Sequence, residues 1–180
     1  MKIKPFTLIL TLLFQFVSLT VFSQKAEGLS SLLDKNAEFI FPQTTDKVAK
    51  VLHTETVFYG DANEEKYAKW LTKSGLELYC SLGKNNVINE MFFDIPDDKV
   101  IIVEGLPFGL VMNKTTLEES KTKFGKYGAK IQKLGDDSSF SGGAKLIFKK
   151  GKYYTTLLFD NKNLLKFIGL TTELADPAAG

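Results

Sequence analysis

Residues 76–95 read LELYCSLGKNNVINEMFFDI, and this stretch decides the fold class. Its first seven residues alternate between apolar and more polar side chains, which is the period of a strand with one buried face. The apolar members of the alternation are Leu76, Leu78, Cys80 and Leu82. Turn residues follow at 83–86, and residues 87–95 form a second apolar run. The stretch therefore predicts an antiparallel hairpin whose apolar phase faces a core.

The C-terminal part of the chain predicts a similar arrangement. Apolar runs at 144–148, 153–159 and 164–170 predict three strands. The turn between the last two contains a Lys-Asn pair at 162–163, which matches the pair at 84–85 in the first hairpin. We therefore expect two similar meanders, one in each half of the chain.

A helix signal precedes each meander. Apolar residues within 44–52 have helical spacing, with Thr44 or Thr45 as the N-cap. In the second half, Thr115-x-x-Glu118 and Thr116-x-x-Glu119 both fit a capping box, and Phe124-Gly125 ends the helix.

We predict an α+β protein in which an antiparallel sheet carries helices on one face. Two tandem helix-meander repeats account for the pattern, the first at 38–98 and the second at 99–171. A mature N-terminal arm at 24–37, with a short helical stretch, precedes them, and a flexible tail at 172–180 follows. The junction is Asp97-Asp98-Lys99, followed by an apolar strand at 100–103. The alternative interpretation is an ordinary α+β domain without a duplication.

Three short motifs of the second half carry a resemblance to known proteins: residues 106–110 (LPFGL), Thr116-x-x-Glu119 and Phe124-Gly125. They resemble the opening of modules in the β-lactamase inhibitor protein-like group and in the small outer-membrane assembly lipoproteins of the BamE type. The resemblance covers 105–170 well and 38–95 weakly. It implies a short helix followed by a three-stranded antiparallel meander, with tandem copies forming one longer curved sheet. The inhibitor proteins carry disulfides and the lipoproteins carry an acylated cysteine, which this sequence lacks, so the resemblance supports a fold rather than an activity.

Residues 1–23 have the features of a cleaved signal peptide. A positively charged start leads into an almost wholly apolar run at 6–22, and Val21 and Ser23 fit a cleavage site before Gln24. We predict a periplasmic or secreted protein without stable membrane insertion after cleavage. It is not expected to be a lipoprotein, because its single cysteine lies far downstream. An uncleaved membrane anchor is the alternative, although the apolar run is short and has no basic flank after it.

The composition disfavours several function classes. All 23 basic residues are lysines, and removal of residues 1–23 leaves 21 lysines against 21 acids, which argues against a nucleic-acid footprint. The absence of arginine removes the bidentate fork that captures phosphate and carboxylate groups. One cysteine cannot form an intramolecular disulfide, and one cysteine with one histidine cannot build a structural zinc site. We predict no cofactor and no metal site.

The candidate catalytic residues are His53 and Cys80. His53 follows the first predicted helix, whereas Cys80 lies in the core phase of a strand, so the two are not expected to form a nucleophilic pair. Adjacent carboxylates at 64–65, 97–98, 118–119 and 136–137 are not expected to form the facing pair of a glycosidase; those at 97–98 and 136–137 fit turns, and those at 118–119 fit the first turn of a helix. We predict that the chain is not an enzyme.

Aromatic residues on the sheet face away from the helices form the predicted recognition surface. Such side chains give a large contact area at a small cost in conformational entropy. The predicted partner-binding residues are Tyr79, Phe92, Lys150, Tyr153 and Tyr154. The alternative is that a third layer or a second copy of the chain covers these side chains.

The sequence thus predicts a secreted or periplasmic, non-enzymatic protein that binds a protein partner through an open aromatic sheet face. Partners of three kinds fit this prediction: the target of an inhibitor, the toxin of an immunity-type protein, or a component of envelope assembly. A carrier of a small apolar ligand is the second hypothesis, and a hydrolase that uses His53 or Cys80 is the third.

Overall fold

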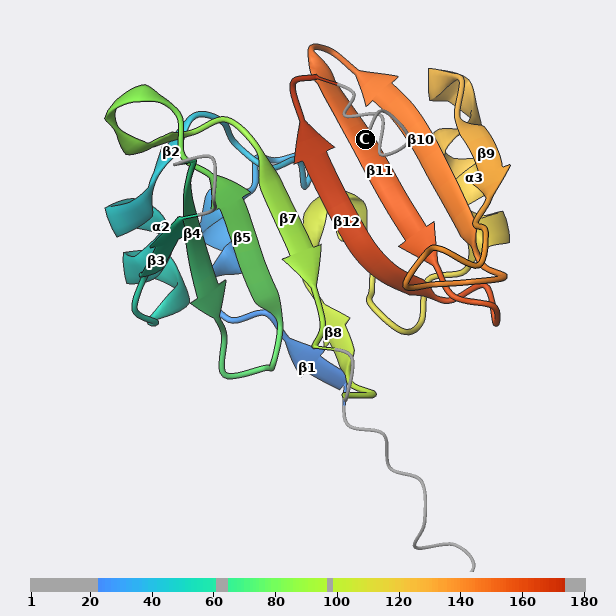
Figure 1. The fold of residues 1–180 in the computed structure, drawn as a ribbon, viewed down its shortest axis with the longest axis horizontal. Helices are drawn as coiled ribbons and strands as arrows, with labels where there is room; N and C mark the ends of the chain where they lie inside the picture. Colours follow the sequence, from blue (N-terminus) through green and yellow to red (C-terminus); the bar gives the residue numbers. More distant parts are fainter. Residues whose placement is uncertain (1–22, 61–64, 97–98, 174–180) are drawn as a thin grey trace, which may run out of the picture.

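A computed structural model describes residues 23–60, 65–96 and 99–173 (Figure 1). Eight antiparallel strands form one sheet, in the order β3-β4-β5-β7-β12-β11-β10-β9. The first half of the chain supplies β3 (Val57–Gly60), β4 (Lys66–Leu71), β5 (Glu77–Ser81) and β7 (Met91–Asp94). The second half supplies β9 (Lys130–Lys133), β10 (Ala144–Lys150), β11 (Tyr153–Phe159) and β12 (Leu165–Thr171).

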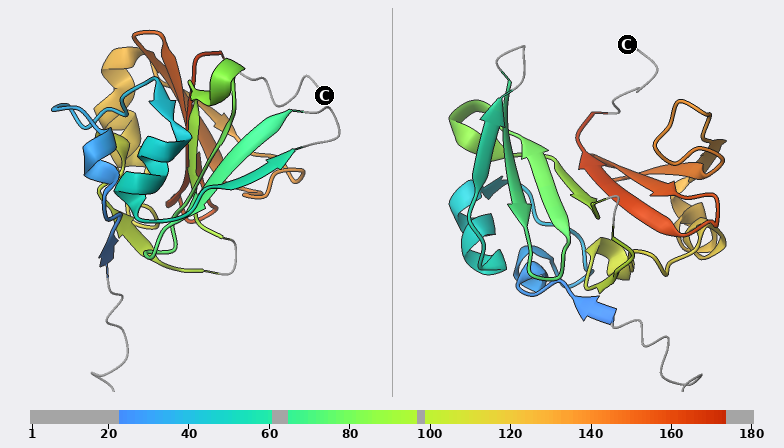
Figure 2. Two further views of the ribbon diagram at one scale, coloured as in Figure 1. Left: turned by 90° about the vertical axis from the view of Figure 1, so that its left-hand side faces the viewer. Right: turned by 60° about the horizontal axis from the view of Figure 1, so that its bottom comes forward.

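The strand order is mirrored about the central pair of strands. The last strand of the first half, β7, pairs antiparallel with the last strand of the second half, β12, and the remaining strands follow outward in reverse chain order. In each half one α-helix, α2 (Thr45–Leu52) or α3 (Leu117–Phe124), precedes the four strands of the large sheet. Both helices lie on the same side of the sheet (Figure 2). The predicted α+β class, an antiparallel sheet with helices on one face, is confirmed.

Shorter elements brace the edges of the two halves. β1 (Ser23–Lys25) pairs in parallel with β8 (Ile102–Glu104), and β2 (Gln43–Thr44) pairs antiparallel with β6 (Val87–Ile88). The 3-10 segments are η1 (Leu29–Leu32), η2 (Lys84–Asn86), η3 (Pro107–Gly109) and η4 (Gly125–Tyr127). The N-terminal arm is therefore docked, and Leu29 and Leu32 within it are fully buried.

Side-chain caps fix where both helices begin. The Thr44 hydroxyl accepts a hydrogen bond from the Lys47 N–H, so Thr44 rather than Thr45 caps α2. At α3, the Thr116 hydroxyl accepts from the Glu119 N–H, and the Glu119 carboxylate accepts from the Thr116 N–H. Of the two predicted capping boxes, the one at Thr116 forms, because only its two side chains bond reciprocally to the backbone of the first turn.

The core fills the space between the sheet and the helices as one cluster. In the first half, Leu76, Leu78 and Cys80 are fully buried, as the alternation predicts, whereas Leu82 is only partly buried. The second half buries an aromatic group in which Phe124 of α3 stacks on Phe148 of β10, with ring centroids 4.2 Å apart. The cores of the two halves are continuous, because β7 and β12 pair through backbone hydrogen bonds.

Three strands of the large sheet were not predicted from the sequence, and one predicted strand lies elsewhere. β3, β4 and β9 were not predicted, so each half contributes four strands to the sheet rather than the three of the expected meander. β3 and β9 are short edge strands with every residue exposed, and such strands show little of the alternation that marks burial. The apolar run at 100–103 does not join the large sheet: β8 pairs with β1, and Val100 is 83% exposed.

Several predictions fall on residues that the structure does not describe. The predicted signal peptide lies outside the described residues except for Ser23, and so do Asp97 and Asp98 of the predicted junction. The predicted tail lies outside them beyond Glu173. Within the described part of the chain, no helix has the length and the apolar character that crossing a bilayer requires.

Candidate functional site: a trough on the open face of the sheet

The face of the sheet opposite the helices carries a mixed row of aromatic, aliphatic and charged side chains. Figure 1 looks onto this face. We call it the open face. The register of the strands places Tyr79 of β5 opposite Phe92 of β7, and Phe92 opposite Gly169 of β12. Tyr79 and Phe92 point away from the helices, because their neighbours Leu78 and Phe93 are fully buried on the other side.

Stacked rings run across the middle of the open face. Tyr79 stacks on Phe92 with ring centroids 5.0 Å apart, and Phe92 stacks on Phe167 of β12 at 5.9 Å. Near the outer edge, Tyr59 of β3 stacks on Tyr67 of β4 at 5.3 Å. Burial raises the pKa of the Tyr79 hydroxyl well above its ordinary value, with the Asp94 carboxylate as a second cause. Tyr79 therefore stays neutral at physiological pH.

Phe167 reaches the open face because β12 contains a β-bulge. Leu158 of β11 pairs with Phe167 and Phe159 pairs with Leu165, which leaves Lys166 as an extra residue between them. Strict alternation from the buried Leu165 would instead have placed Phe167 in the core. The bulge thus turns one more aromatic ring outward, beside Phe92.

Gly169 opens a space between these rings. A Cβ atom at this position would lie 3.1 Å from the nearest ring atom of Phe167 and 3.3 Å from that of Phe92. Any larger side chain would therefore push the two rings apart or fill the space above the strand. The small residue lets both rings lie low over β12.

A trough of about 750 Å³ follows this part of the face. It crosses the junction between β7 and β12 and continues over β11 and β10. Its floor consists of apolar and small side chains: Phe92, Ile147, Thr156, Leu158, Phe167 and Gly169. Both halves of the chain therefore contribute to a single depression.

The rim of the trough carries more negative than positive charge. Three carboxylates, Glu65, Glu90 and Glu173, lie along it, together with one ammonium group, that of Lys145. Glu90 is held in place, since its carboxylate accepts hydrogen bonds from both the hydroxyl and the N–H of Ser81. A floor of rings with an acidic rim suits a ligand that combines an apolar group with positive charge.

The five predicted partner-binding residues do not lie on one surface. Tyr79 and Phe92 lie in the middle of the open face, and Tyr154 lies on the same face in β11, opposite Thr171. Lys150 and Tyr153 pair with each other at the ends of β10 and β11 and point to the helix side. Because side chains alternate along a strand, the neighbours Tyr153 and Tyr154 must face opposite ways.

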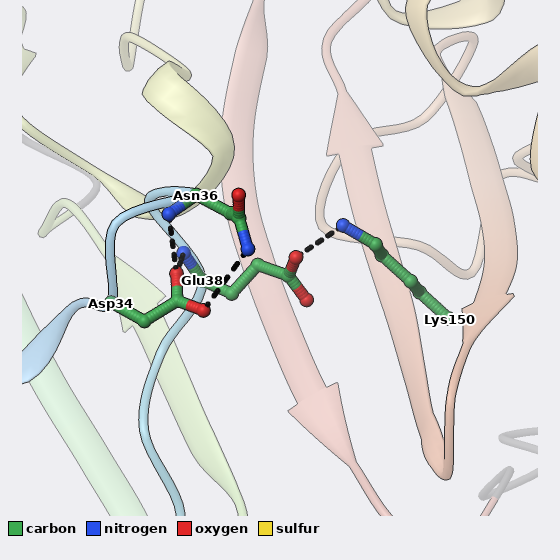
Figure 3. A network of polar contacts seen from close by, with 4 residues as sticks. All are labelled: Asp34, Asn36, Glu38 and Lys150. Atoms are coloured by element: carbon green, nitrogen blue, oxygen red, sulfur yellow. Dashed lines mark hydrogen bonds and ion pairs between the residues drawn. The ribbon is translucent and has the colours of Figure 1, made fainter.

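Tyr153 and Lys150, the two residues on the helix side, both contact other side chains of the chain. Tyr153 stacks on Phe41 with ring centroids 4.8 Å apart. Lys150 forms an ion pair with Glu38, beneath a loop in which the Asp34 carboxylate accepts from the N–H groups of Asn36 and Glu38 (Figure 3). The Lys150 ammonium group donates a hydrogen bond to the Glu38 carboxylate, which raises the pKa of Lys150. Lys150 thus ties the N-terminal arm to the second half of the sheet.

The trough residues that the sequence analysis missed come mostly from the second half. Ile147, Thr156 and Leu158 alternate with core residues and could have been found from the phase of their strands. Phe167 could not, because the bulge at Lys166 breaks the alternation. Gly169 carried no signal of its own, since its role depends on which strand lies beside it.

The candidate catalytic residues lie apart from the trough. Cys80 is fully buried on the helix side, and burial raises the pKa of its thiol to about 12. His53 is exposed and ends α2 in a left-handed backbone conformation. Among the described residues, no group of three histidine, cysteine or acidic side chains gathers closely enough to hold a metal ion.

Comparisons with known proteins place this chain in no known family. No protein-family model matches the sequence, and no curated protein matches it. A solved structure that aligns with the chain is that of a DUF4309 family protein, YjgB, from Bacillus subtilis. The two share 12% identity with a TM-score of 0.44, and the alignment covers 82% of this chain and 99% of the other. The resemblance to inhibitor-type and BamE-type modules stays a prediction.

Proposed function

We propose that this chain is a secreted or periplasmic, non-enzymatic protein that binds a protein partner in the trough of the open face. The observation that carries the proposal is the ring-floored trough of about 750 Å³ at the junction of the two halves. Aromatic side chains in a depression are the usual anchors of protein interfaces, because they bury much area and have few rotatable bonds to fix. Inhibitor, immunity-type and envelope-assembly roles all fit such a surface.

The charge around the trough narrows the chemistry of the partner. Glu65, Glu90 and Glu173 outnumber Lys145 on the rim, so the matching surface of the partner should carry lysine or arginine around an apolar centre. The rim charges would speed association and make it dependent on salt, whereas the rings would govern how slowly the complex dissociates.

Two features support a non-enzymatic role. A nucleophilic cysteine needs a thiolate, and the raised pKa of Cys80 keeps its thiol protonated at physiological pH. His53 is exposed at the end of a helix, whereas Cys80 is fully buried beneath the sheet. Neither residue lines the trough.

Export is the remaining element of the proposal, and it rests on the signal-peptide features of residues 1–23. It is tested by expressing the full chain in a bacterial host, fractionating the cells and sequencing the N-terminus of the product. We expect the protein in the periplasm or medium with Gln24 as its first residue. Recovery of the full-length chain from the cytoplasm or the membrane would reject this element.

Partner binding is tested by photo-cross-linking in the envelope. A photoreactive amino acid replaces Thr156, on the floor of the trough, and in a matched variant it replaces Thr122, which is exposed on α3. We expect a discrete protein adduct from position 156 and none from position 122. Equal cross-linking from both positions, or from neither, contradicts the proposal.

Alanine variants of the neighbouring residues Tyr153 and Tyr154 test which face of the sheet binds the partner. Once the partner is identified, Tyr154→Ala and Phe92→Ala should weaken binding at least tenfold, because both rings are on the open face. Tyr153→Ala should bind like the wild type, since this ring packs against Phe41 on the helix side. Loss of binding in Tyr153→Ala alone would place the interface on the other face.

A carrier of a small apolar ligand is the second candidate function. Its support is the volume of the trough, which falls within the range of about 300–1,000 Å³ for small-molecule sites. A carrier predicts that oleate raises the melting temperature of the purified protein, and that Thr156→Trp abolishes this rise by filling the trough. A protein-binding role predicts no such rise.

A further inference from the structure

The strand β3 forms one outer edge of the sheet, and its apolar side chains are exposed. β3 pairs only with β4, so the outward-facing backbone groups of Val57–Gly60 have no partner strand among the described residues. Val57 and Phe58 are each 58% exposed, and Tyr59 is 43% exposed. An uncharged edge with free backbone donors and acceptors is a template for an added strand.

The opposite edge of the same sheet is protected. β9 begins with Lys130 and ends with Lys133, and all four of its residues are exposed. Lysine on an edge strand hinders the approach of another strand, because pairing would remove the charges from water. The sheet thus discourages pairing at β9, while β3 carries no such protection.

A hollow of about 540 Å³ lies beside the unprotected edge. Phe58, Gly60, Leu82 and Asn86 line it, together with parts of Lys66 and the two tyrosines of the hairpin. Phe58 points to the helix side, because it pairs with the buried Ala68. A strand added at β3 would therefore lie next to a pocket that can accept one of its side chains.

We propose that β3 is a strand-addition site for an extended segment of a protein partner. The segment pairs with the backbone of Val57–Gly60 and places one apolar side chain in the hollow between Phe58 and Leu82. Main-chain hydrogen bonds provide the affinity of such sites, and pockets for alternate side chains provide their specificity. The segment should therefore alternate between apolar and polar residues and lack proline.

An extended segment fits this edge better than a second copy of the chain. Pairing of β3 with the β3 of a second copy would join only four residues from each chain. A four-residue edge also buries far less than the roughly 1,200–2,000 Å² of a stable interface between two rigid bodies. A segment that becomes ordered on binding can follow both the edge and the hollow.

The strand-addition site differs from the trough on the open face, although Tyr67 of β4 borders both the hollow and the trough. Phe58, which borders the hollow, lies on the helix side of the sheet, and β3 contributes no residue to the trough. A failure of the trough proposal therefore leaves the strand-addition proposal intact, and the reverse also holds.

The test uses a phage-displayed library of random ten-residue peptides, selected on the immobilised protein from Gln24 onward. We expect an enriched family with alternating apolar residues whose binding falls at least tenfold in Phe58→Lys. Ile131→Lys, which adds a charge to the other edge at a side chain that is 44% exposed, should bind like the wild type. Phe92→Ala, in the trough, should also bind normally.

Phe58→Ser serves as a second variant that removes the ring without adding charge, and circular dichroism checks that each variant is folded. Bound peptide should slow hydrogen exchange at the amides of Val57–Gly60. The proposal is overturned if no family is enriched, or if the enriched peptides bind Phe58→Lys normally. It is also overturned if sedimentation shows a dimer that Phe58→Lys dissociates, because the occupant is then a second copy.

Discussion

The two halves of the sheet share one plan but differ in how they are filled and how they end. The first half buries Trp70, Phe39 and Phe93 singly or in edge contact among aliphatic side chains, and it ends in the uncharged edge β3. The second half buries a group of stacked rings around Phe148 and ends in the lysine-bearing edge β9. The same order of elements therefore leaves one half with an edge open to strand pairing and the other with a protected edge.

The largest expected effect tests whether the halves unfold together. Phe148→Ala should destabilise the protein by about 3–5 kcal/mol, because Phe148 is 2% exposed and stacks on Phe124. Trp70, the only tryptophan, lies in the other half and reports on it by fluorescence. Urea unfolding followed by this fluorescence and by circular dichroism should show one shared, shifted transition. Two separate transitions would mean that the halves are independent units.

The next prediction compares how much the two helix caps contribute to stability. Thr116→Ala and Thr44→Ala should each cost about 1 kcal/mol, with Thr116→Ala the larger of the two. The cap at Thr116 is reciprocal, whereas at Thr44 one hydrogen bond, 3.3 Å long, is made by the side chain. Urea midpoints of both variants check the order, with Thr→Ser substitutions as controls that keep the hydroxyl. An equal loss would show that the second hydrogen bond of the box contributes nothing measurable.

A smaller effect concerns the ion pair that joins the N-terminal arm to the second half. Glu38→Gln should cost less than about 1 kcal/mol, since both side chains remain about 30% exposed. The pKa of Lys150 is raised in the folded state, so the stabilisation is complete below its ordinary value of 10.5 and disappears as the pH rises through the folded value. The difference in melting temperature between the wild type and Glu38→Gln should therefore vanish at strongly alkaline pH. A difference that persists there would have another cause.

The smallest expected effect concerns the stability of the protein at acidic pH. Backbone hydrogen bonds lower the pKa of Asp34 in the arm and of Glu119 at α3. The stability that these carboxylates provide is present above their ordinary pKa values and is lost as the pH falls through the lowered ones. Asp34→Asn and Glu119→Gln should each flatten the fall in melting temperature between neutral pH and about pH 3. Unchanged acid sensitivity in both variants would assign acid unfolding to other groups.

The sequence predicted those elements whose signal is local. The helices could be placed because a threonine begins each one, and the core phase of β5 could be placed because it alternates strictly. The edge strands were missed, since exposure on both faces removes the alternation. The order of strands, with β7 beside β12, depends on pairing between distant parts of the chain and leaves no local pattern.

The candidate site was predicted only in part. Tyr79, Phe92 and Tyr154 were assigned to the correct face by alternation alone. Lys150 and Tyr153 were grouped with them because they are close in sequence, although the same alternation places them on the helix side. Phe167 and Gly169 complete the trough only because the two halves meet at β12, so neither could be found from a single strand.

The bulge in β12 also determines how firmly the floor of the trough is held. The extra residue, Lys166, turns its ammonium group to the carboxylate of Asp160 and the amide oxygen of Asn113. Its neighbour Leu165 exchanges backbone hydrogen bonds with Asn113 and Thr115, just before the capped start of α3. Phe167 therefore follows two residues, Leu165 and Lys166, that are held by hydrogen bonds and an ion pair. A partner that binds there meets a preorganised floor, so association orders little of the protein beneath it and loses correspondingly little entropy.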